Sequence, residues 1–214
     1  MTPAQIIVEA RRVLQDAIAP FRYSEEIMLA FVNQTIKRIA IARPDFFAEI
    51  AEVPTQAGNV LQTLPSDAVR VMEVFSVRGG NAVIEVDRTA MDQNYPQWVA
   101  DSAAPCVNWM RHPRSPTKFF IYPKAPEGQV LIAEYATSPR DYTAGEEIES
   151  IPTAYYPVLV DGVVFLAESI DDEHVNNGRA QMYQQMFTQA LGITLNSRIV
   201  TDTENAGVGG GVTD

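Results

Sequence analysis

The residue types best suited to chemistry in this sequence are its single cysteine and a histidine close to it. Cys106 could act as a nucleophile and His112 as its base, since a thiol attacks a carbonyl only after losing its proton. Neither residue lies in the signature of a known thiol-enzyme family, so we interpret both as structural. One cysteine cannot form an intrachain disulfide or a multi-cysteine zinc site. We expect no catalytic residue, no cofactor and no metal.

A second candidate for chemistry is the run Asp171-Asp172-Glu173-His174, whose side chains are common metal ligands. Consecutive helical residues point in different directions, and only Asp171 and His174 would share a face. The alternative, which we favour, is an acidic cluster that stabilises the start of a helix through the helix dipole. The sequence contains no Gly-Lys-Ser/Thr phosphate loop, His-Glu-x-x-His zinc motif or Gly-x-Ser-x-Gly nucleophile motif. It therefore favours a non-enzymatic function.

The composition is that of an ordinary globular protein, with 214 residues, 46% of them hydrophobic and 20% charged. The formal net charge of -11 argues against wrapping DNA, because binding to phosphates needs clustered Lys and Arg. No apolar run approaches the roughly 18 residues of a membrane span, and the first residues lack the apolar region of a secretory signal. We expect a soluble protein that is made in a cytoplasm and does not enter a membrane.

Helical periodicity occupies both ends of the chain. The first predicted helix begins at Thr2-Pro3 and ends at Pro20, and the second begins with Ser24 as its cap and ends at Arg43-Pro44. The third covers residues 155–170, where Gly162 costs about 1 kcal/mol relative to alanine, and the fourth covers about 173–197. The apolar residues at helical spacing in the first helix are Ile6, Ile7, Ala10, Leu14, Ala17 and Ile18.

Short apolar runs separated by Gly, Pro, Asn and Asp fill the middle of the chain and predict an antiparallel sheet. The clearest element is a hairpin in which residues 69–77 and 82–87 flank the turn Arg78-Gly79-Gly80-Asn81. Further strands are expected at residues 107–110, 118–122 and 129–135.

The order helix, helix, sheet, helix, helix predicts an α+β fold. Residues 1–45 and 143–200 are expected to form a four-helix bundle, and residues 46–142 an inserted antiparallel β module. Residues 201–214 contain three acidic residues and four glycines but no basic or aromatic residue, which is typical of a flexible tail. We refer to residues 201–214 as the tail.

The fourth predicted helix carries an unusually wide apolar stripe that includes Met182, Met186 and Ile193, beside a second row of Tyr183, Phe187, Leu191 and Leu195. One interpretation is a helix buried deeply in its own bundle. The other is a helix that packs on its own chain and on a neighbouring subunit through Met182, Met186 and Ile193. The sequence leaves both open.

Nine acidic residues and no Lys or Arg lie between Asp141 and Glu173. A solvated surface is the ordinary explanation for such a segment. In an assembly around DNA, the same charges could line a channel and repel phosphates. The candidate channel acids are Asp161, Glu168, Asp171 and Asp172.

Several motifs in the middle of the chain resemble, in order and spacing, landmarks of phage adaptor proteins. They are Leu64-Pro65-Ser66-Asp67-Ala68-Val69-Arg70, Ala82-Val83-Ile84-Glu85-Val86-Asp87-Arg88, Pro96-Gln97-Trp98, Phe119-Phe120-Ile121-Tyr122-Pro123-Lys124-Ala125-Pro126, residues 130–139 and Ile151-Pro152. The resemblance covers nearly the whole chain except the tail. Arg111-His112-Pro113 departs from it, since the family leads us to expect an aromatic residue and an acid before the proline.

The resemblance implies a head-to-tail connector of a short-tailed bacteriophage. In such a particle, twelve copies would form a ring beneath the portal protein and contact a tail tube or nozzle protein, and tail fibres could dock on the β module. DNA would pass through the ring during ejection without specific binding, and the protein would be assembled in the host cytoplasm into the virion at the portal-tail junction. The expected portal-docking residues are Val208, Gly209, Gly210, Gly211 and Val212.

A different class of function, small-molecule or glycan binding, would use aromatic residues of the sheet. Trp98, Trp109 and Tyr122 could form a stacking surface for a ligand. Aromatic residues of a hydrophobic core would explain the same pattern.

Overall fold

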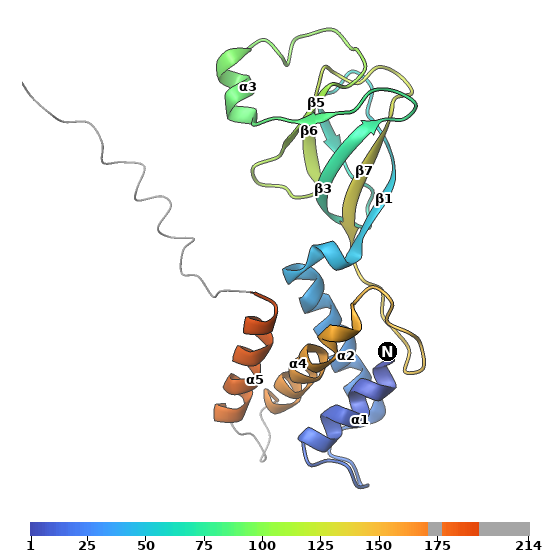
Figure 1. Ribbon diagram of the computed structural model, residues 1–214, viewed down its shortest axis with the longest axis vertical. Coiled ribbons are helices and arrows are strands. Elements are labelled where there is room, and N and C mark those ends of the chain that lie inside the picture. The colour runs from blue at the N-terminus through green and yellow to red at the C-terminus, as the bar shows by residue number, and fades with distance from the viewer. Residues whose placement is uncertain (171–176, 193–214) are drawn as a thin grey trace, which may run out of the picture. The chain divides into compact units, whose positions relative to one another are not determined.

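A computed structural model describes residues 1–170 and 177–192, and in this part of the chain it contains five α-helices and two β-sheets (Figure 1). The fold is therefore α+β, as predicted. The chain divides into two units. The helical unit contains residues 1–35, 142–149 and the described residues from 153 onward, and the β unit contains residues 36–141 and 150–152. No helix in the described residues is long and apolar enough to span a bilayer.

Helix α1, Pro3–Val13, begins where the sequence predicts, because Thr2 and Gln5 cap each other. The backbone N–H of Gln5 donates to Thr2 Oγ1 at 3.4 Å, and the N–H of Thr2 donates to Gln5 Oε1 at 2.9 Å. The predicted extension to Pro20 is wrong, because the helix ends with Leu14 as its cap and Gln15 takes a positive φ of 59°. Ile18 is consequently 85% exposed and belongs to the loop before the next helix.

The other three helices of this unit are α2, Glu25–Ala42, whose last turns lie in the β unit, α4, Tyr156–Glu168, and α5, Asn177–Ala190. Helix α4 packs against both α1 and α5 (Figure 1). Gly162 of α4 allows two close approaches, since a Cβ atom there would overlap Thr35 of α2 and lie 2.9 Å from the ring of Phe187 of α5. The glycine that weakens α4 as a helix thus permits its packing.

Residues 142–149 of the helical unit are held to the N-terminal part of the chain by hydrogen bonds. Asn33 of α2 exchanges two with the backbone of Tyr142, at 2.8 and 3.0 Å. The N–H of Ile148 donates to the carbonyl of Met1 at 2.9 Å. Tyr23 donates its hydroxyl to the carbonyl of Ala167 at the end of α4, at 2.7 Å. Segments from both ends of the sequence therefore share one unit.

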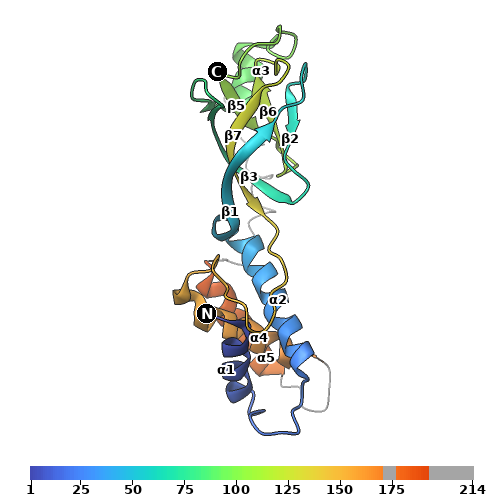
Figure 2. The same cartoon turned by 90° about the vertical axis from the view of Figure 1, so that its right-hand side faces the viewer.

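Two sheets build the β unit (Figure 2). The first has the order β1-β7-β3, and the second has the order β2-β6-β5-β4. The strands are β1 Ala48–Pro54, β2 Leu61–Thr63, β3 Ala68–Val77, β4 Ile84–Glu85, β5 Asn108–Arg111, β6 Lys118–Tyr122 and β7 Val130–Thr137. The short helices are α3, Arg88–Asn94, and the 3-10 turns Pro44–Phe47 and Thr153–Tyr155.

Side chains of both sheets meet in one hydrophobic core. Val74 and Leu131 enter it from the first sheet, and Trp109 and Phe119 enter it from the second. The rings of Trp109 and Phe119 pack edge to face, with centroids 6.4 Å apart. A smaller cluster beneath α3 joins Trp98 and Met110 to Val60.

The predicted hairpin forms at its turn and in the pairs next to it, and the prediction is wrong for the rest of the second arm. The turn forms, with the N–H of Val77 donating to the carbonyl of Asn81 at 3.0 Å, and Ser76 and Ala82 form an isolated bridge. Val83 is then buried between the sheets, and β4 pairs in parallel with β5 of the other sheet. The second arm of the expected hairpin therefore crosses from one sheet to the other, and the prediction of a purely antiparallel module is also wrong.

Candidate interaction surfaces

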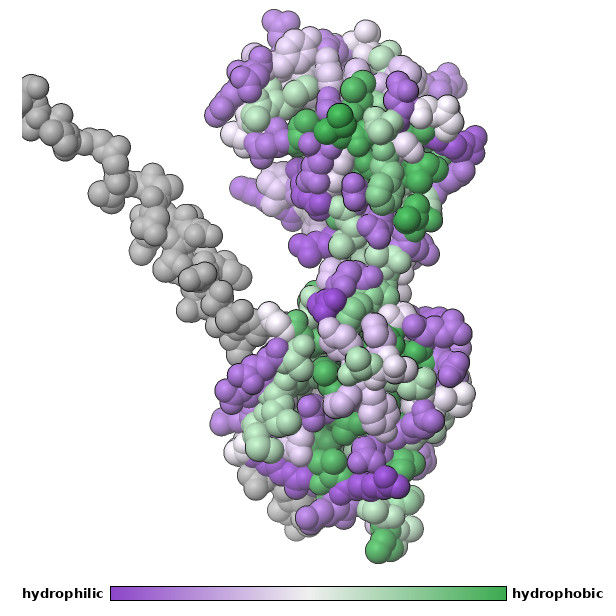
Figure 3. Space-filling model, in the orientation of Figure 1, coloured by the Kyte–Doolittle hydropathy of each residue, from purple (hydrophilic) through white to green (hydrophobic). Residues whose placement is uncertain are grey.

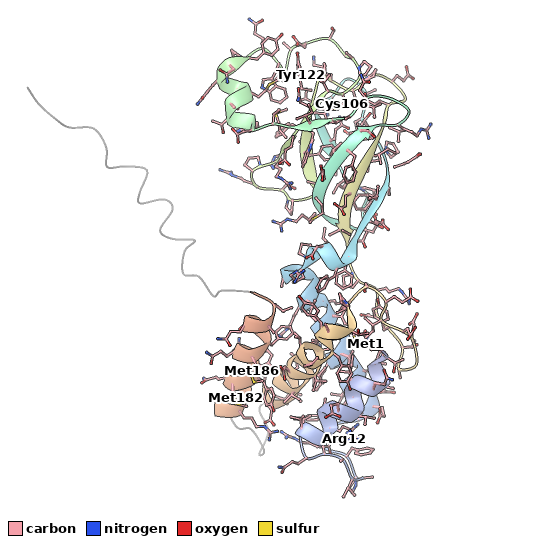
Figure 4. The ribbon with its side chains drawn as sticks, viewed as in Figure 1. Met1, Arg12, Cys106, Tyr122, Met182 and Met186 are labelled. Atoms are coloured by element: carbon pink, nitrogen blue, oxygen red, sulfur yellow. The ribbon has the colours of Figure 1, made fainter. Side chains whose placement is uncertain are left out.

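Helix α5 separates its two apolar rows onto different faces. Phe187 and Leu191 are buried against the rest of the helical unit, whereas Met182 and Met186 are 47% and 44% exposed. The two methionines are labelled on α5 in Figure 4. At 100° per residue, Met182 lies about 140° and Met186 about 100° around the helix from Phe187, so the methionines form a second, partly exposed apolar face. The third predicted packing residue, Ile193, lies outside the described residues.

Glu168 and Arg179 form an ion pair between α4 and α5. The carboxylate of Glu168 is only 3% exposed, and its Oε1 lies 3.5 Å from Nε of Arg179. Arg179 also donates to the backbone carbonyl of Val13 at the end of α1. One guanidinium therefore joins three helices, and the carboxylate of Glu168 faces a cation instead of solvent.

The other predicted channel acids have different surroundings. Asp161 is half-buried on α4, and burial raises the pKa of its carboxyl group. Asp171 and Asp172 lie outside the described residues, as do Val208, Gly209, Gly210, Gly211 and Val212 of the tail. The described structure therefore brings Asp161 and Glu168 onto one helix but places only Glu168 in an ion pair between helices.

Cys106 and His112 have separate structural partners. Burial raises the pKa of the Cys106 thiol to about 12, so the group is protonated at neutral pH. Its Sγ donates to the carbonyl of Asn108 at 3.3 Å. His112 accepts the backbone N–H groups of Arg114 and Ser115 at its Nδ1 atom, at 3.2 and 2.9 Å. Within the described residues, no group of three His, Cys, Asp or Glu side chains could hold a metal ion.

The proposed aromatic stacking surface does not exist in this form. Trp98 is 2% exposed and Trp109 is fully buried, so neither ring can cover a ligand. Tyr122 is half-buried, and its hydroxyl donates to Asp101 at 2.8 Å. The hydrogen bond to Asp101 raises the pKa of Tyr122 to about 12, and the negative charge of Asp101 adds to the effect. Tyr122 and Cys106 are labelled in Figure 4.

The loop between α1 and α2 is an apolar surface that the sequence did not reveal. Ile18 and Phe21 are exposed, and this loop forms the green region at the lower end of Figure 3. Beneath it, the buried guanidinium of Arg11 donates to Asp16 at 2.6 Å and to the carbonyl of Tyr23 at 2.8 Å. The periodicity of Ala17 and Ile18 continued that of α1, so no sequence signal marked the loop.

A family model described as SU10 adaptor protein matches residues 1–209. The chain belongs to the SU10 adaptor protein family. This family is one of phage adaptor proteins, and SU10 is a short-tailed phage. A comparison with curated proteins gave no match.

The family match confirms the resemblance to phage adaptors that the order of motifs suggested. It spans the helical unit, the inserted β unit and most of the tail, so each of these parts belongs to the adaptor. Membership indicates a structural component of the phage particle that contacts portal and tail components and assembles with itself. The surfaces of the adaptor are therefore best considered as contacts with other proteins.

Proposed function

We propose that this adaptor forms a ring of twelve copies beneath the portal protein and joins it to the tail, leaving a channel through which DNA passes. The observation that carries the proposal is the partly exposed apolar face of α5 at Met182 and Met186, which is separate from the buried face of the helix. A second protein surface would remove these methionines from water, and methionine adapts well to such contacts. Family membership supports a neighbouring adaptor copy as that surface.

In this proposal, α1, α2, α4 and α5 form a four-helix bundle, and bundles pack side by side around the ring. The packing of α4 against α1 and α5, and its close approach to α2 at Gly162, supports a single bundle. Met182, Met186 and Ile193 contribute to the contact between copies. The β unit is free to contact tail proteins or fibres.

The channel would be electronegative, because each copy carries a formal charge of -11. Of the predicted channel acids, Asp161, Asp171 and Asp172 remain proposed to face the DNA. Glu168 is ion-paired with Arg179, so its contribution to the channel would be smaller than its formal charge suggests. DNA would slide through without forming lasting phosphate contacts.

The test is to image the purified adaptor by negative-stain electron microscopy with and without its portal protein. We expect monomers or weak oligomers alone and rings on the portal, because assembly on a preformed ring multiplies weak contacts. Light scattering measures the oligomer in the absence of the portal. A small oligomer that is independent of concentration and ignores the portal would contradict the proposal.

A further inference from the structure

The β unit contains two adjoining hollows that share Arg70 and Pro116. We call them the apolar half and the basic half of one groove. The apolar half has a volume of about 460 Å³ and the basic half about 300 Å³. Both volumes fall in the range of about 300–1,000 Å³ that binding pockets occupy. All of their lining residues belong to the β unit.

Positive charge is concentrated along this groove, although the chain has 27 acidic and only 16 basic residues. Five of the 16 line it, and no acidic residue does so among the described residues. Arg70, Arg114 and Lys118 are exposed and form no ion pair within the described part of the chain. The remaining two, Lys37 and Arg111, are paired with Asp141 and Glu85.

The basic half is held in place by hydrogen bonds. Arg111, the last residue of β5, donates to the carbonyls of Val71 and Met72, at 3.2 and 2.7 Å, and so ties the end of β5 to β3. His112 accepts two backbone N–H groups at Nδ1 and stacks on the ring of Phe120, with centroids 5.4 Å apart. These hydrogen bonds fix the backbone of residues 112–115, which carries the exposed cation Arg114.

The apolar half is formed by aliphatic and proline side chains. Ile41 is 82% exposed and Val69 is 39% exposed, and Ala40 and three prolines line the hollow with them. Its polar lining residues are Lys37, Arg70 and Ser138. These side chains can cover an aliphatic group. They provide no aromatic surface on which a nucleotide base could stack.

We propose that this groove binds an extended acidic segment of a partner protein. An aliphatic side chain of the partner occupies the apolar half, beside Ile41 and Val69. Neighbouring carboxylates pair with Arg70, Arg114 and Lys118. Charge complementarity selects an acidic partner, and the apolar half favours a peptide over nucleic acid. The identification of that partner as a component of the phage particle rests on the proposed function.

The groove is tested by fluorescence anisotropy on the isolated full-length protein. The probe is a fluorescein-labelled peptide, Gly-Glu-Val-Asp-Glu-Val-Gly, and its control replaces both valines with serine. Arg70→Glu should weaken binding of the valine peptide about tenfold, because it removes one attraction and adds a repulsion. Arg12→Glu is the matched control, since Arg12 is an exposed arginine of the helical unit and the change in net charge is the same. It should alter binding less than about twofold.

A second variant distinguishes specific binding in the groove from a general attraction between opposite charges. Ile41→Ser should weaken the valine peptide severalfold and leave the weaker serine peptide unchanged, because only valine uses the apolar half. Circular dichroism confirms that each variant is folded, which is expected because Arg70 and Ile41 are exposed.

Three outcomes would overturn the inference. They are no binding of the valine peptide at millimolar concentration, equal effects of Arg70→Glu and Arg12→Glu, and tighter binding of a single-stranded DNA of equal charge through Arg70. Because these measurements need no ring, their failure would leave the proposed assembly intact. Failure of the ring to form would likewise leave the binding data valid.

Discussion

At the scale of single residues, the buried carboxylate of Glu168 depends on Arg179. Replacing Arg179 with alanine should lower the free energy of unfolding by about 2 to 3 kcal/mol, because an unpaired carboxylate would remain in a dry site. The value lies below that of a fully buried pair, since the arginine side chain is 30% exposed. Urea unfolding followed by circular dichroism measures the loss.

The control removes both charges together. The double variant Glu168→Gln, Arg179→Met should be more stable than Arg179→Ala alone, because no charge is left buried without a partner. If Arg179→Ala unfolded at the same urea concentration as the unchanged protein, the ion pair would contribute nothing to stability.

The sequence predicts some properties of Glu168, Met182 and Met186 but not which residues they contact. The sequence shows that acidic residues are clustered between Asp141 and Glu173. Arg179 lies outside that segment, and its pairing with Glu168 depends on how α4 and α5 pack. The exposure of Met182 and Met186 had a clearer signal, since the apolar stripe was too wide for one buried face. Sequence could not decide which row was buried.

At the scale of elements, the crossing of α2, α4 and α5 depends on Gly162. Gly162→Ala should destabilise the protein by about 1 to 2 kcal/mol, although alanine favours a helix by about 1 kcal/mol. The added Cβ would overlap Cγ2 of Thr35 and press on the ring of Phe187. Thermal unfolding provides the measurement.

A companion substitution tests this cause. Thr35→Ser removes Cγ2 but keeps the hydroxyl that donates to the carbonyl of Phe31 at 2.8 Å. Adding it to Gly162→Ala should recover part of the lost stability. A Gly162→Ala protein more stable than the unchanged chain would show that the helices move apart at little cost.

The proposed subunit contact at Met182 and Met186 of α5 is tested by replacing both methionines with charged residues. Met182→Lys combined with Met186→Lys should abolish rings on the portal and change the stability of the monomer little, because both side chains are exposed. Gln181→Lys combined with Gln184→Lys is the matched control, since both glutamines are exposed on other parts of the same helix. Electron microscopy of each variant mixed with portal protein shows whether rings form. Equal assembly of both double variants would remove this face from the subunit contact.

Most helices and the strands β3, β5, β6 and β7 followed from sequence patterns because their signals are local. Caps and prolines marked the start of α1 and the limits of α2, and β6, Lys118–Tyr122, matched its prediction in full. The prediction missed β1, β2 and α3, and it paired the arms of a hairpin that belong to different sheets. Which strands pair is decided by contacts between residues far apart in the chain, such as those of β1 with β7.

At the scale of the whole molecule, the proposed channel depends on the sum of charges over the ring. Asp161→Lys combined with Asp172→Lys should slow DNA ejection from assembled particles, because positive groups would hold phosphates. Glu168 is left unchanged, since its replacement would also break the pair with Arg179. Glu73→Lys combined with Glu127→Lys makes the same change in net charge on exposed sites of the β unit. Unchanged ejection in the first variant would place Asp161 and Asp172 away from the DNA.

The tail is proposed to attach the ring to the portal. Deletion of residues 201–214 should leave the free energy of unfolding unchanged within about 0.5 kcal/mol, because the last buried side chain among the described residues is that of Leu191, well before the deletion. The deleted protein should nevertheless fail to assemble on portals. Glycines allow the backbone to approach a partner closely, while Val208 and Val212 offer apolar contacts.

Ordering an extended segment costs about 1 to 2 kcal/mol per residue in backbone entropy, so one tail would bind weakly and a ring of tails would bind together. A full-length variant with Val208→Asp and Val212→Asp separates the apolar contacts from tail length, and it should show the same defect as the deletion. For both variants, portal binding is measured by sedimentation, and the yield of infectious particles is counted. Normal yields of infectious particles from the deleted protein would show that other surfaces of the adaptor hold the portal.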